Sequence, residues 1–388
     1  MEQKTIKQSF SVPYTYQLYF TAGVFNADNP LFTNLIKGYR SAGRTKLLFV
    51  LDDGLGAHHG ELAEKIAAYT SKNSAHLDHA DTITVLGGER AKEGNTQVEL
   101  VLKAINENAI CRHSFVVAIG GGAVIDMVGY AAAIAHRGVK LIRVPTTVLA
   151  QNDAAVGVKN SVNVFGKKNF LGTFAPPHAI INDREFLDTL EQRDWISGIA
   201  EAIKVALLKD EAFFAYIEQH AINLKNREME PMQYVIYKCA EMHMQHISAG
   251  GDPFEAGSSR PLDFGHWAAH KLEHMTGYAV RHGEAVAKGI ALDCTYAHLM
   301  GLLDNGALQR ILDVFTAIGF DISFPVHTEN GMEELLQGIE EFREHLGGTL
   351  TLTLIKGLGV KHDVHTVDKP LMVQALKQLN QRFALNPS

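Results

Sequence analysis

The sequence has little that would suit a membrane protein or a secreted protein. It has no run of roughly eighteen uncharged apolar residues, the length that a bilayer-spanning helix needs. The first sixteen residues carry scattered charges and no long apolar run, so we expect no secretory signal. The only cysteines are Cys111, Cys239 and Cys294, an odd number that does not suit a disulfide framework. These absences predict a cytoplasmic protein.

The sequence also lacks a basic excess, internal repeats and low-complexity tracts. Its formal net charge is −7 at pH 7, so no broad positive field attracts a nucleic-acid backbone. Hydrophobic residues make up 46% and charged residues 20% of the chain, which is the composition of a globular protein. Its 388 residues exceed one typical domain, so we expect two.

Strand and helix patterns divide the chain near residue 190. Before it, short β-branched runs alternate with helical stretches, which is typical of βαβ units on a parallel sheet. After it, longer segments with a period of 3.6 residues follow, interrupted by one β-like run at 349–359. We therefore predict an α/β fold, with a parallel-sheet domain over 1–190 and a mainly α-helical domain over 191–388. The predicted strands are 47–53, 82–88, 115–122, 141–147 and 179–183.

Polar or glycine-rich segments follow three of these strands. In AIGGGAVIDMVGY (118–130), three glycines allow the backbone to approach a diphosphate at the start of a helix, although a tight turn without a ligand is the alternative. The loop 87–94 contains Glu89 and Lys92, and the loop 144–163 contains further polar residues. Because the carboxyl ends of parallel strands line one crevice, the three segments together favour dinucleotide binding.

Two helical segments of the second half carry groups that bind metals. Glu201 and Lys204 are three residues apart among apolar neighbours, which suggests an enclosed pair rather than the usual exposed one. The stretch 260–285 holds four of the nineteen histidines, and His266 and His270 share a helix face. A lone histidine there is best explained by a structural hydrogen bond. With Glu201 as a candidate carboxylate, the set favours a mixed His/Glu site of the catalytic zinc type.

Seven segments resemble the sugar phosphate cyclases, the superfamily of 3-dehydroquinate synthase, over about residues 45–360. The order and spacing of the segments carry the resemblance: GERAK (88–92), GGGAVIDMVGYAAAIAHRGV (120–139), VPTTVLAQNDAAVGVKNSVN (144–163), GKKNFLGTF (166–174), GIAEAIKVALLKD (198–210), DFGHWAAHKLE (263–273) and HGEAVAKGI (282–290). Segment 251–273 is similar to cyclase-like proteins encoded in bacterial ebo-type gene clusters. The glycerol and iron-type alcohol dehydrogenases share the GGG…D loop, but lack AQNDAAVGVK and GKKNFLGTF.

The resemblance implies a Rossmann-like NAD domain, a helical metal domain, an active site in the cleft between them and a homodimer. It implies that Zn²⁺ or Co²⁺ is held by Glu201, His266 and His282. The implied NAD-contacting residues are Asp52, Glu89, Lys92, Gly121, Gly122, Asp126, Thr146, Thr147, Asp153, Lys168 and Asn169. The implied catalytic residues are Asp153, Lys159, Lys204, Asp263 and His270. The implied phosphate-binding residues are Lys159, Asn169, Arg343 and, reaching a neighbouring subunit, Arg137.

The implied reaction is a transient oxidation by NAD, elimination of phosphate, reduction, and an intramolecular aldol closure. Four positions depart from dehydroquinate synthases. Met242 and Ser259 replace a lysine and an arginine that hold the substrate carboxylate, although Arg260 lies one residue away and could compensate. Asp263 replaces an asparagine, and Arg343 replaces a lysine but keeps a positive charge for phosphate.

Methionine cannot pair with a carboxylate and aspartate repels one. We therefore expect a phosphorylated sugar without the carboxylate, such as sedoheptulose 7-phosphate. The alternatives are 3-dehydroquinate synthase itself, a metal-dependent dehydrogenase of the glycerol type, and a binding protein without catalysis.

Overall fold

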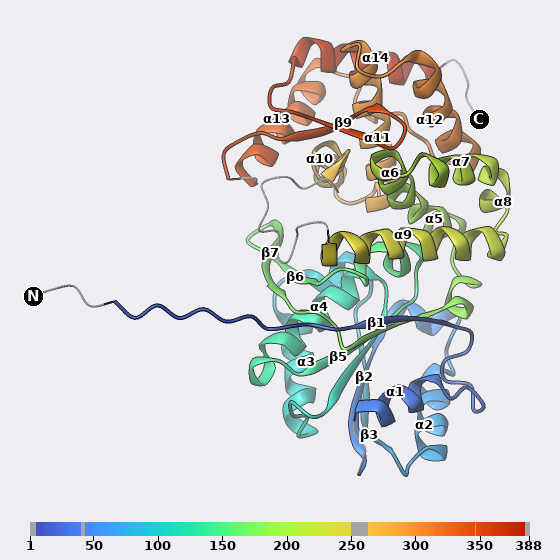
Figure 1. The fold of residues 1–388 in the computed structure, drawn as a ribbon, viewed down its shortest axis with the longest axis vertical. Coiled ribbons are helices and arrows are strands. Elements are labelled where there is room, and N and C mark those ends of the chain that lie inside the picture. Colours follow the sequence, from blue (N-terminus) through green and yellow to red (C-terminus); the bar gives the residue numbers. More distant parts are fainter. Residues whose placement is uncertain (1–4, 40–42, 250–262, 346, 385–388) are drawn as a thin grey trace, which may run out of the picture. The chain divides into compact units, whose positions relative to one another are not determined.

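The computed structural model describes residues 5–39, 43–249, 263–345 and 347–384, and the chain divides into two compact units (Figure 1). The first unit comprises Met1–Ile119, Ala123–Val144 and Val158–Asn182. The second comprises Asp183–Ser388 and two short segments, Gly120–Gly122 and Pro145–Gly157. Those two segments follow strands of the first unit, so strand ends of the α/β part contribute residues to the helical part.

The first unit is built on a six-stranded sheet in the order β1-β8-β5-β4-β2-β3. Strand β2 runs parallel to β3 and β4, and β5 runs parallel to β8, which confirms the predicted α/β parallel-sheet architecture. Every residue of β4 is buried, because helices cover parallel sheets on both faces. The strands are β1 (Gln17–Thr21), β2 (Thr45–Asp52), β3 (Leu77–Val85), β4 (Phe115–Gly120), β5 (Lys140–Pro145) and β8 (Ala179–Asp183). The helices are α1 (Leu31–Tyr39), α2 (Leu62–Lys72), α3 (Thr96–Glu107) and α4 (Gly122–Ile134).

The predicted loop at 144–163 contains more regular structure than its polar composition indicates. One π-helical turn, Ala150–Ala154, is followed by β6 (Lys159–Val164), which forms an antiparallel hairpin with β7 (Lys167–Phe174). Phe165 and Gly166 join these strands, both with positive φ angles of 57° and 68°, as a two-residue hairpin turn requires. A phenylalanine at such a position is not a usual turn signal, so the sequence did not predict this hairpin.

The second unit is mainly helical and ends in one small hairpin (Figure 1). The predicted helix 194–210 is divided at Gly198, where an added Cβ would lie only 2.4 Å from the backbone nitrogen of Leu149. The predicted β-like run at 349–359 forms β9, which pairs with β10. The elements are α5 (Gln192–Ser197), α6 (Ile199–Lys209), α7 (Glu211–Gln219), α8 (Ala221–Lys225), α9 (Met229–Ala249), α10 (His266–Met275), α11 (His282–Leu299), α12 (Asn305–Ile318), α13 (Glu329–His345), β9 (Leu352–Gly357), β10 (Val360–Val364) and α14 (Lys369–Ala384).

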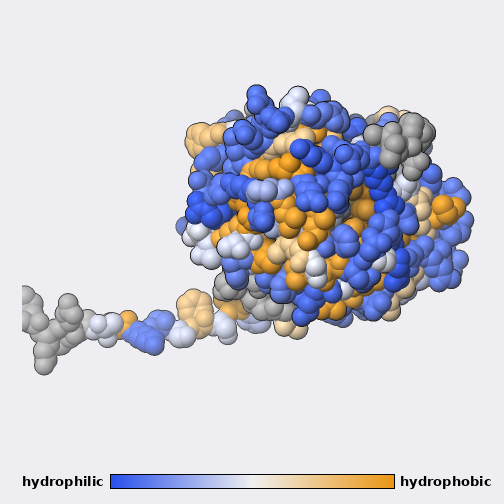
Figure 2. Space-filling view, turned by 90° about the horizontal axis from the view of Figure 1, so that it is seen from above, coloured by the Kyte–Doolittle hydropathy of each residue, from blue (hydrophilic) through white to orange (hydrophobic). Residues whose placement is uncertain are grey.

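Helix α11 is the central element of the second unit. Fourteen of its eighteen residues are buried, because other helices and the β9–β10 hairpin surround it. Among the described residues, no helix combines the length and the apolar character needed to cross a membrane. On the face seen in Figure 2, apolar areas (orange) lie among hydrophilic ones (blue).

Candidate functional site

Three helices of the second unit begin at one point, and each brings one of the predicted metal ligands. Glu201 lies in the first turn of α6, His266 is the first residue of α10 and His282 is the first residue of α11. Helix N-termini carry partial positive charge and exposed N–H groups, which favour anionic atoms. The arrangement therefore suits a cation held by a carboxylate, with an oxyanion bound beside it.

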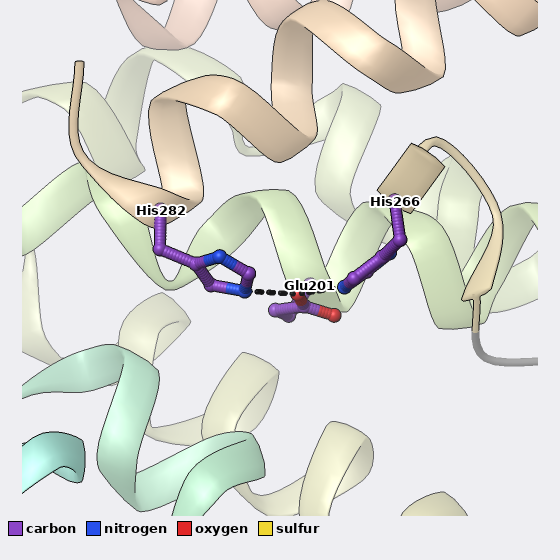
Figure 3. Close-up of side chains that lie close together, drawn as sticks. All are labelled: Glu201, His266 and His282. Atoms are coloured by element: carbon purple, nitrogen blue, oxygen red, sulfur yellow. Dashed lines mark ion pairs between the residues drawn. The ribbon is translucent and has the colours of Figure 1, made fainter. Parts of the chain in front are cut away.

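The three side chains point toward one another, with the two imidazoles on either side of the carboxylate (Figure 3). Nε2 of His266 lies 3.4 Å from Oε1 of Glu201, and Nε2 of His282 lies 3.6 Å from the same oxygen. One ligand atom from each residue lies within 4.8 Å of the other two. The structure thus brings together two histidines and a glutamate separated by up to 81 positions in the sequence.

Hydrogen bonds fix which nitrogen of each histidine faces the carboxylate. Nδ1 of His266 lies 3.0 Å from the backbone oxygen of Phe264, and Nδ1 of His282 lies 3.2 Å from Oε2 of Glu273. Both oxygens can only accept, so Nδ1 of each ring is the donor. In the neutral form of each ring, Nε2 then carries the lone pair by which metal-binding imidazoles coordinate an ion.

A buried lysine balances part of the negative charge around this group. Lys204 forms an ion pair with Glu201, and the two side chains are 3% and 1% exposed. Burial alone raises the pKa of Glu201, but the charges of Lys204 and His266 hold it well below its usual value. Burial lowers the pKa of Lys204, yet the charges of Glu201 and Asp153 raise it overall, with a further contribution from Asp263. Three carboxylates thus act on one lysine.

The donor set and its unsatisfied atoms fit a divalent metal. Neither oxygen of Glu201 accepts a hydrogen bond of good geometry within the described part of the chain, and Oδ2 of Asp263 is equally buried and unsatisfied. Leaving buried carboxylate oxygens unsatisfied is unfavourable, and a cation removes that penalty. Two imidazoles and one carboxylate are the ligands of catalytic zinc sites that keep a position open for substrate.

A second polar cluster lies in the first unit, around Lys92. This lysine is 3% exposed, and its Nζ donates to Asp126 at 2.7 Å, to Ser161 at 2.9 Å and to Asn169. Nearby, Lys168 lies 3.6 Å from Glu89. The residues come from α4, the β6–β7 hairpin and the turn Gly88–Lys92. The structure therefore brings together five of the predicted cofactor-binding residues.

Other predicted cofactor residues lie where strands of the sheet end. Asp52 ends β2 and accepts a hydrogen bond from the backbone of Gly54, and an added Cβ on Gly87 would lie 2.0 Å from its Oδ1. Gly121 lies between β4 and α4, and Gly122 is the first residue of α4. Thr146 follows β5 with its backbone N–H bonded to Gly120, and Thr147 caps the π-helical turn through Ala150. These positions agree with the crevice that strand ends form in parallel sheets.

Asp153 and His270 lie at the metal group. Asp153 is on the π-helical turn, and its Oδ1 lies 3.0 Å from Nδ1 of His243. Burial and the charge of Glu201 raise its pKa, but His243 and Lys204 lower it overall. The ring of His270 is centred 5.5 Å from that of His266 and 6.1 Å from that of His282.

Three predicted phosphate-binding residues come from different elements of the chain. Lys159 begins β6 opposite Phe174, at the other end of the hairpin from Asn169. Arg137, with a φ angle of 64°, lines a surface pocket of the first unit with Arg112 and His136. Arg343 is 43% exposed and pairs with Glu340 on its own helix. Ser259 and Arg260 lie outside the described residues.

Sequence reasoning missed several residues of both clusters. Glu273, His243 and Ser161 all contact predicted site residues, but none shows a distinctive spacing. Met242, which the resemblance places where a carboxylate-binding lysine is expected, is buried in the apolar core of the second unit. Glu273 lies one helical turn after His270 in the sequence. A search for carboxylates near the candidate histidines could have found it.

Family models and curated relatives identify the family. The model for the 3-dehydroquinate synthase N-terminal domain matches residues 82–197, and the C-terminal model matches 198–341. A 3-dehydroquinate synthase of Halorhodospira halophila is 34% identical over 320 residues, which cover 80% of this chain and 88% of that protein. One of Coxiella burnetii is 37% identical over 283 residues, covering 72% of this chain and 77% of that protein.

Solved structures agree with this assignment. A 2-epi-5-epi-valiolone synthase of Streptomyces hygroscopicus with NAD⁺ and Zn²⁺ bound has a TM-score of 0.87 and 28% identity, covering 97% of this chain and all of that one. A 2-deoxy-scyllo-inosose synthase shares the fold at a TM-score of 0.76 and 22% identity, covering 93% of this chain and 96% of that one. The metal-ligand pattern and both family models agree, and the chain belongs to the 3-dehydroquinate synthase family within the sugar phosphate cyclases.

Proposed function

We propose that this protein is a carbon–oxygen lyase that cyclises a phosphorylated sugar with NAD and a divalent metal, zinc or cobalt. The observation that carries the proposal is the convergence of Glu201, His266 and His282 at three helix starts, beside the buried Lys204. The enzyme is further proposed to work in the cytoplasm as a homodimer, with Arg137 at a partner's phosphate.

The carboxylates around Lys204 support the binding of a divalent metal ion. Glu201, Asp153 and Asp263 carry three negative charges when ionised, and Lys204 carries one positive charge. Among these four groups the negative charges outnumber the positive one, so the group has room for a bound cation. Since buried charges are unfavourable unless they are paired, the balance favours a bound metal.

When bound, the metal would stabilise the alkoxide and enolate charge, and NAD would take up and return a hydride. The residues of the chain would hold and orient the substrate. Lys204 would donate hydrogen bonds to oxygens of the sugar, and His270, which is exposed beside the ligand histidines, would accept a proton from a substrate hydroxyl.

Asp263 supports a substrate without a carboxylate. Its Oδ2 is buried, unsatisfied and able to accept a hydrogen bond from a sugar hydroxyl, whereas Met242 packs in the apolar core and supplies no positive charge for a carboxylate. A substrate carboxylate near Asp263 would meet a like charge instead, which is unfavourable in a buried site. Neutral sugar phosphates such as sedoheptulose 7-phosphate fit this pattern.

The test is a substrate panel with the purified full-length protein, NAD and Zn²⁺ or Co²⁺. We expect inorganic phosphate to be released from sedoheptulose 7-phosphate or glucose 6-phosphate, with no net accumulation of NADH. Faster phosphate release from the carboxylated precursor of dehydroquinate would overturn the substrate proposal and favour 3-dehydroquinate synthase, the activity that the curated relatives' names give. Steady NADH formation from glycerol without phosphate release would support a dehydrogenase.

Variants make the panel sharper. Glu201→Gln should abolish phosphate release and metal retention together, whereas Glu241→Gln, a change on the surface of α9, should leave both intact. The double variant Met242→Lys with Asp263→Asn introduces two of the three side chains that the resemblance to dehydroquinate synthases implies for carboxylate binding. It should gain activity on the carboxylated compound relative to the unmodified protein. A protein that retains no divalent metal after purification and metal loading would instead support a binding role.

A further inference from the structure

The position of the metal ligand His266 depends on the short junction that precedes α10. His266 is the first residue of the helix, and Gly265 before it has a φ angle of 77°, a conformation that favours glycine. A change of a few degrees at this junction would move the imidazole relative to Glu201 and His282. The contacts that hold Gly265 therefore bear on metal binding.

Helix α11 packs directly against the backbone of this junction. An added Cβ on Gly265 would lie 2.6 Å from the nitrogen of Ile290, and one on Gly289 would lie 2.0 Å from the oxygen of Gly265. The two glycines let the start of α10 lie directly on α11. Because His282 begins α11, this contact fixes the separation of the two helices that carry the histidine ligands.

Asp293, one turn after Gly289 on α11, binds the same junction by hydrogen bonds. Its Oδ2 accepts from the backbone nitrogen of Gly265 at 3.0 Å, and its Oδ1 accepts from Nε1 of Trp267 at 2.9 Å. Gly265 and Trp267 are the two neighbours of His266 in the chain. The carboxylate therefore holds the residues on both sides of the ligand.

Burial of the Asp293 carboxylate is unfavourable for the stability of the core. It is fully buried, Trp267 is 1% exposed, and no lysine or arginine of the described residues forms an ion pair with it. An apolar residue at this place in a helix–helix contact is commonly as stable or more stable than a buried charge. A buried carboxylate without a cation points to a role other than stability.

We propose that Asp293 is a positioning residue for the metal site, which holds His266 opposite His282 by binding both neighbours of His266. The inference rests on the proposed metal function. It assigns Asp293 no contact with metal or substrate.

The test measures metal affinity and needs no substrate. The full-length protein is freed of metal with a chelator and titrated with Zn²⁺ against a chromophoric competitor. It is then titrated with Co²⁺ while the visible absorption of the bound ion is recorded. Asp293→Asn leaves one acceptor oxygen for two donors. It should weaken Zn²⁺ binding about 10–100-fold, as changes of groups that orient metal ligands do, and alter the Co²⁺ spectrum.

Thr295→Val is the matched control. Thr295 lies two residues further along the same helix, is 3% exposed, and its hydroxyl donates to the backbone oxygen of Ala291, also in α11, at 2.7 Å. It should lower the urea midpoint but leave Zn²⁺ affinity within about twofold of the unmodified protein, since the hydrogen bond that it removes lies within α11. Equal losses of affinity in both variants would mean that Asp293 acts only through general stability and would overturn the proposal.

Trp267→Phe covers the case in which Asp293→Asn does not fold. It keeps an aromatic ring and removes only one of the two donors, so affinity should fall by a few fold. Unchanged Zn²⁺ affinity in every folded variant would overturn the role of Asp293 while leaving the metal function intact. Failure of the unmodified protein to bind either metal would overturn both.

Discussion

Glu273 and His282 are joined by a contact of 3.2 Å between Oε2 and Nδ1, directly behind the metal-ligand group. Glu273 is 2% exposed and lies on α10, the helix that begins with His266. A carboxylate behind an imidazole fixes its tautomer and raises its basicity. Helix α10 thus supplies one ligand and the residue that orients another.

Glu273→Gln should weaken metal binding without removing a ligand. The amide can still contact Nδ1, but it carries no charge to make the imidazole more basic, so we expect a loss of about 10-fold or more in Zn²⁺ affinity. Competition with a chelator measures it. The control is Glu241→Gln, which alters a partly exposed pair with Lys238. Equal Zn²⁺ affinities for the two variants would count against this role of Glu273.

Lys92→Met should destabilise the first unit and lower its affinity for NAD. Removing the lysine leaves Asp126, whose side chain is 21% exposed, without its ion-pair partner, which typically costs about 3–5 kcal/mol. Urea unfolding and NAD titration by fluorescence measure the two effects. Adding Asp126→Asn to Lys92→Met should recover part of the stability, because the uncompensated charge is gone.

The control for this pair is Lys72→Met, at a lysine 55% exposed that pairs with the exposed Asp28. Its effect on the free energy of unfolding should stay below about 1 kcal/mol, the usual limit for surface pairs. If Lys92→Met changed the free energy of unfolding as little as Lys72→Met, the cluster around Lys92 would not stabilise the first unit.

His243→Ala should make the protein less stable in mild acid. His243 lowers the pKa of Asp153 against burial and the charge of Glu201, which raise it, while Lys204 also lowers it. A carboxyl with a lowered pKa contributes stability at pH values above its unfolded pKa, and that contribution is lost as the pH falls through the folded pKa. In the variant the folded pKa is higher, so the loss should begin at a higher pH.

Urea midpoints measured from pH 4 to 7 test this expectation. Gln245→Ala, an exposed change on the same helix, should keep the pH dependence of the unmodified protein. Parallel curves for His243→Ala and the unmodified protein would show that the contact does not shift Asp153.

Asp293 should give the opposite pH dependence. Burial raises the pKa of this carboxyl to about 7, and the hydrogen bonds from Trp267 and Gly265 only partly oppose that effect. A raised folded pKa contributes stability below the unfolded pKa of about 3.9, and that stability is lost as the pH rises to about 7. Asp293→Asn removes this pH-dependent contribution. Between pH 5 and 7 the free energy of unfolding of the variant should therefore fall by about 2–3 kcal/mol less than that of the unmodified protein. Urea unfolding of the metal-free proteins at the two pH values measures the difference.

The sequence predicted the sheet well because buried parallel strands leave a strong local signal. Five β-branched runs ending in Gly, Asp or Thr correspond to β2, β3, β4, β5 and β8. Strand β1 and the β6–β7 hairpin were missed, since β1 has only five residues and the sequences of the hairpin strands, KNSVNV and KKNFLGTF, contain neither a continuous β-branched run nor a strict alternation of polar and apolar residues. The division of the predicted helix at Gly198 depends on close packing against Leu149, which no local pattern records.

The residues expected to bind the metal directly were predicted, whereas the residues that orient them were not. Histidine spacing on one helix indicated a mixed His/Glu site, and the resemblance to a known family implied that Glu201, His266 and His282 are its ligands; the structure brings these three residues together. Residues that act through others, such as Glu273 and Asp293, have no spacing of their own, because their partners come from another helix.

The sequence by itself determined the α/β class, the position of the strand ends and the family, because these depend on local periodicity and on motifs read along the chain. Only the tertiary structure decided that three helix starts meet at one point, that Lys204 balances several carboxylates there, and that Asp293 grips both neighbours of His266. These are contacts between segments far apart in the chain, and packing rather than local propensity sets their geometry.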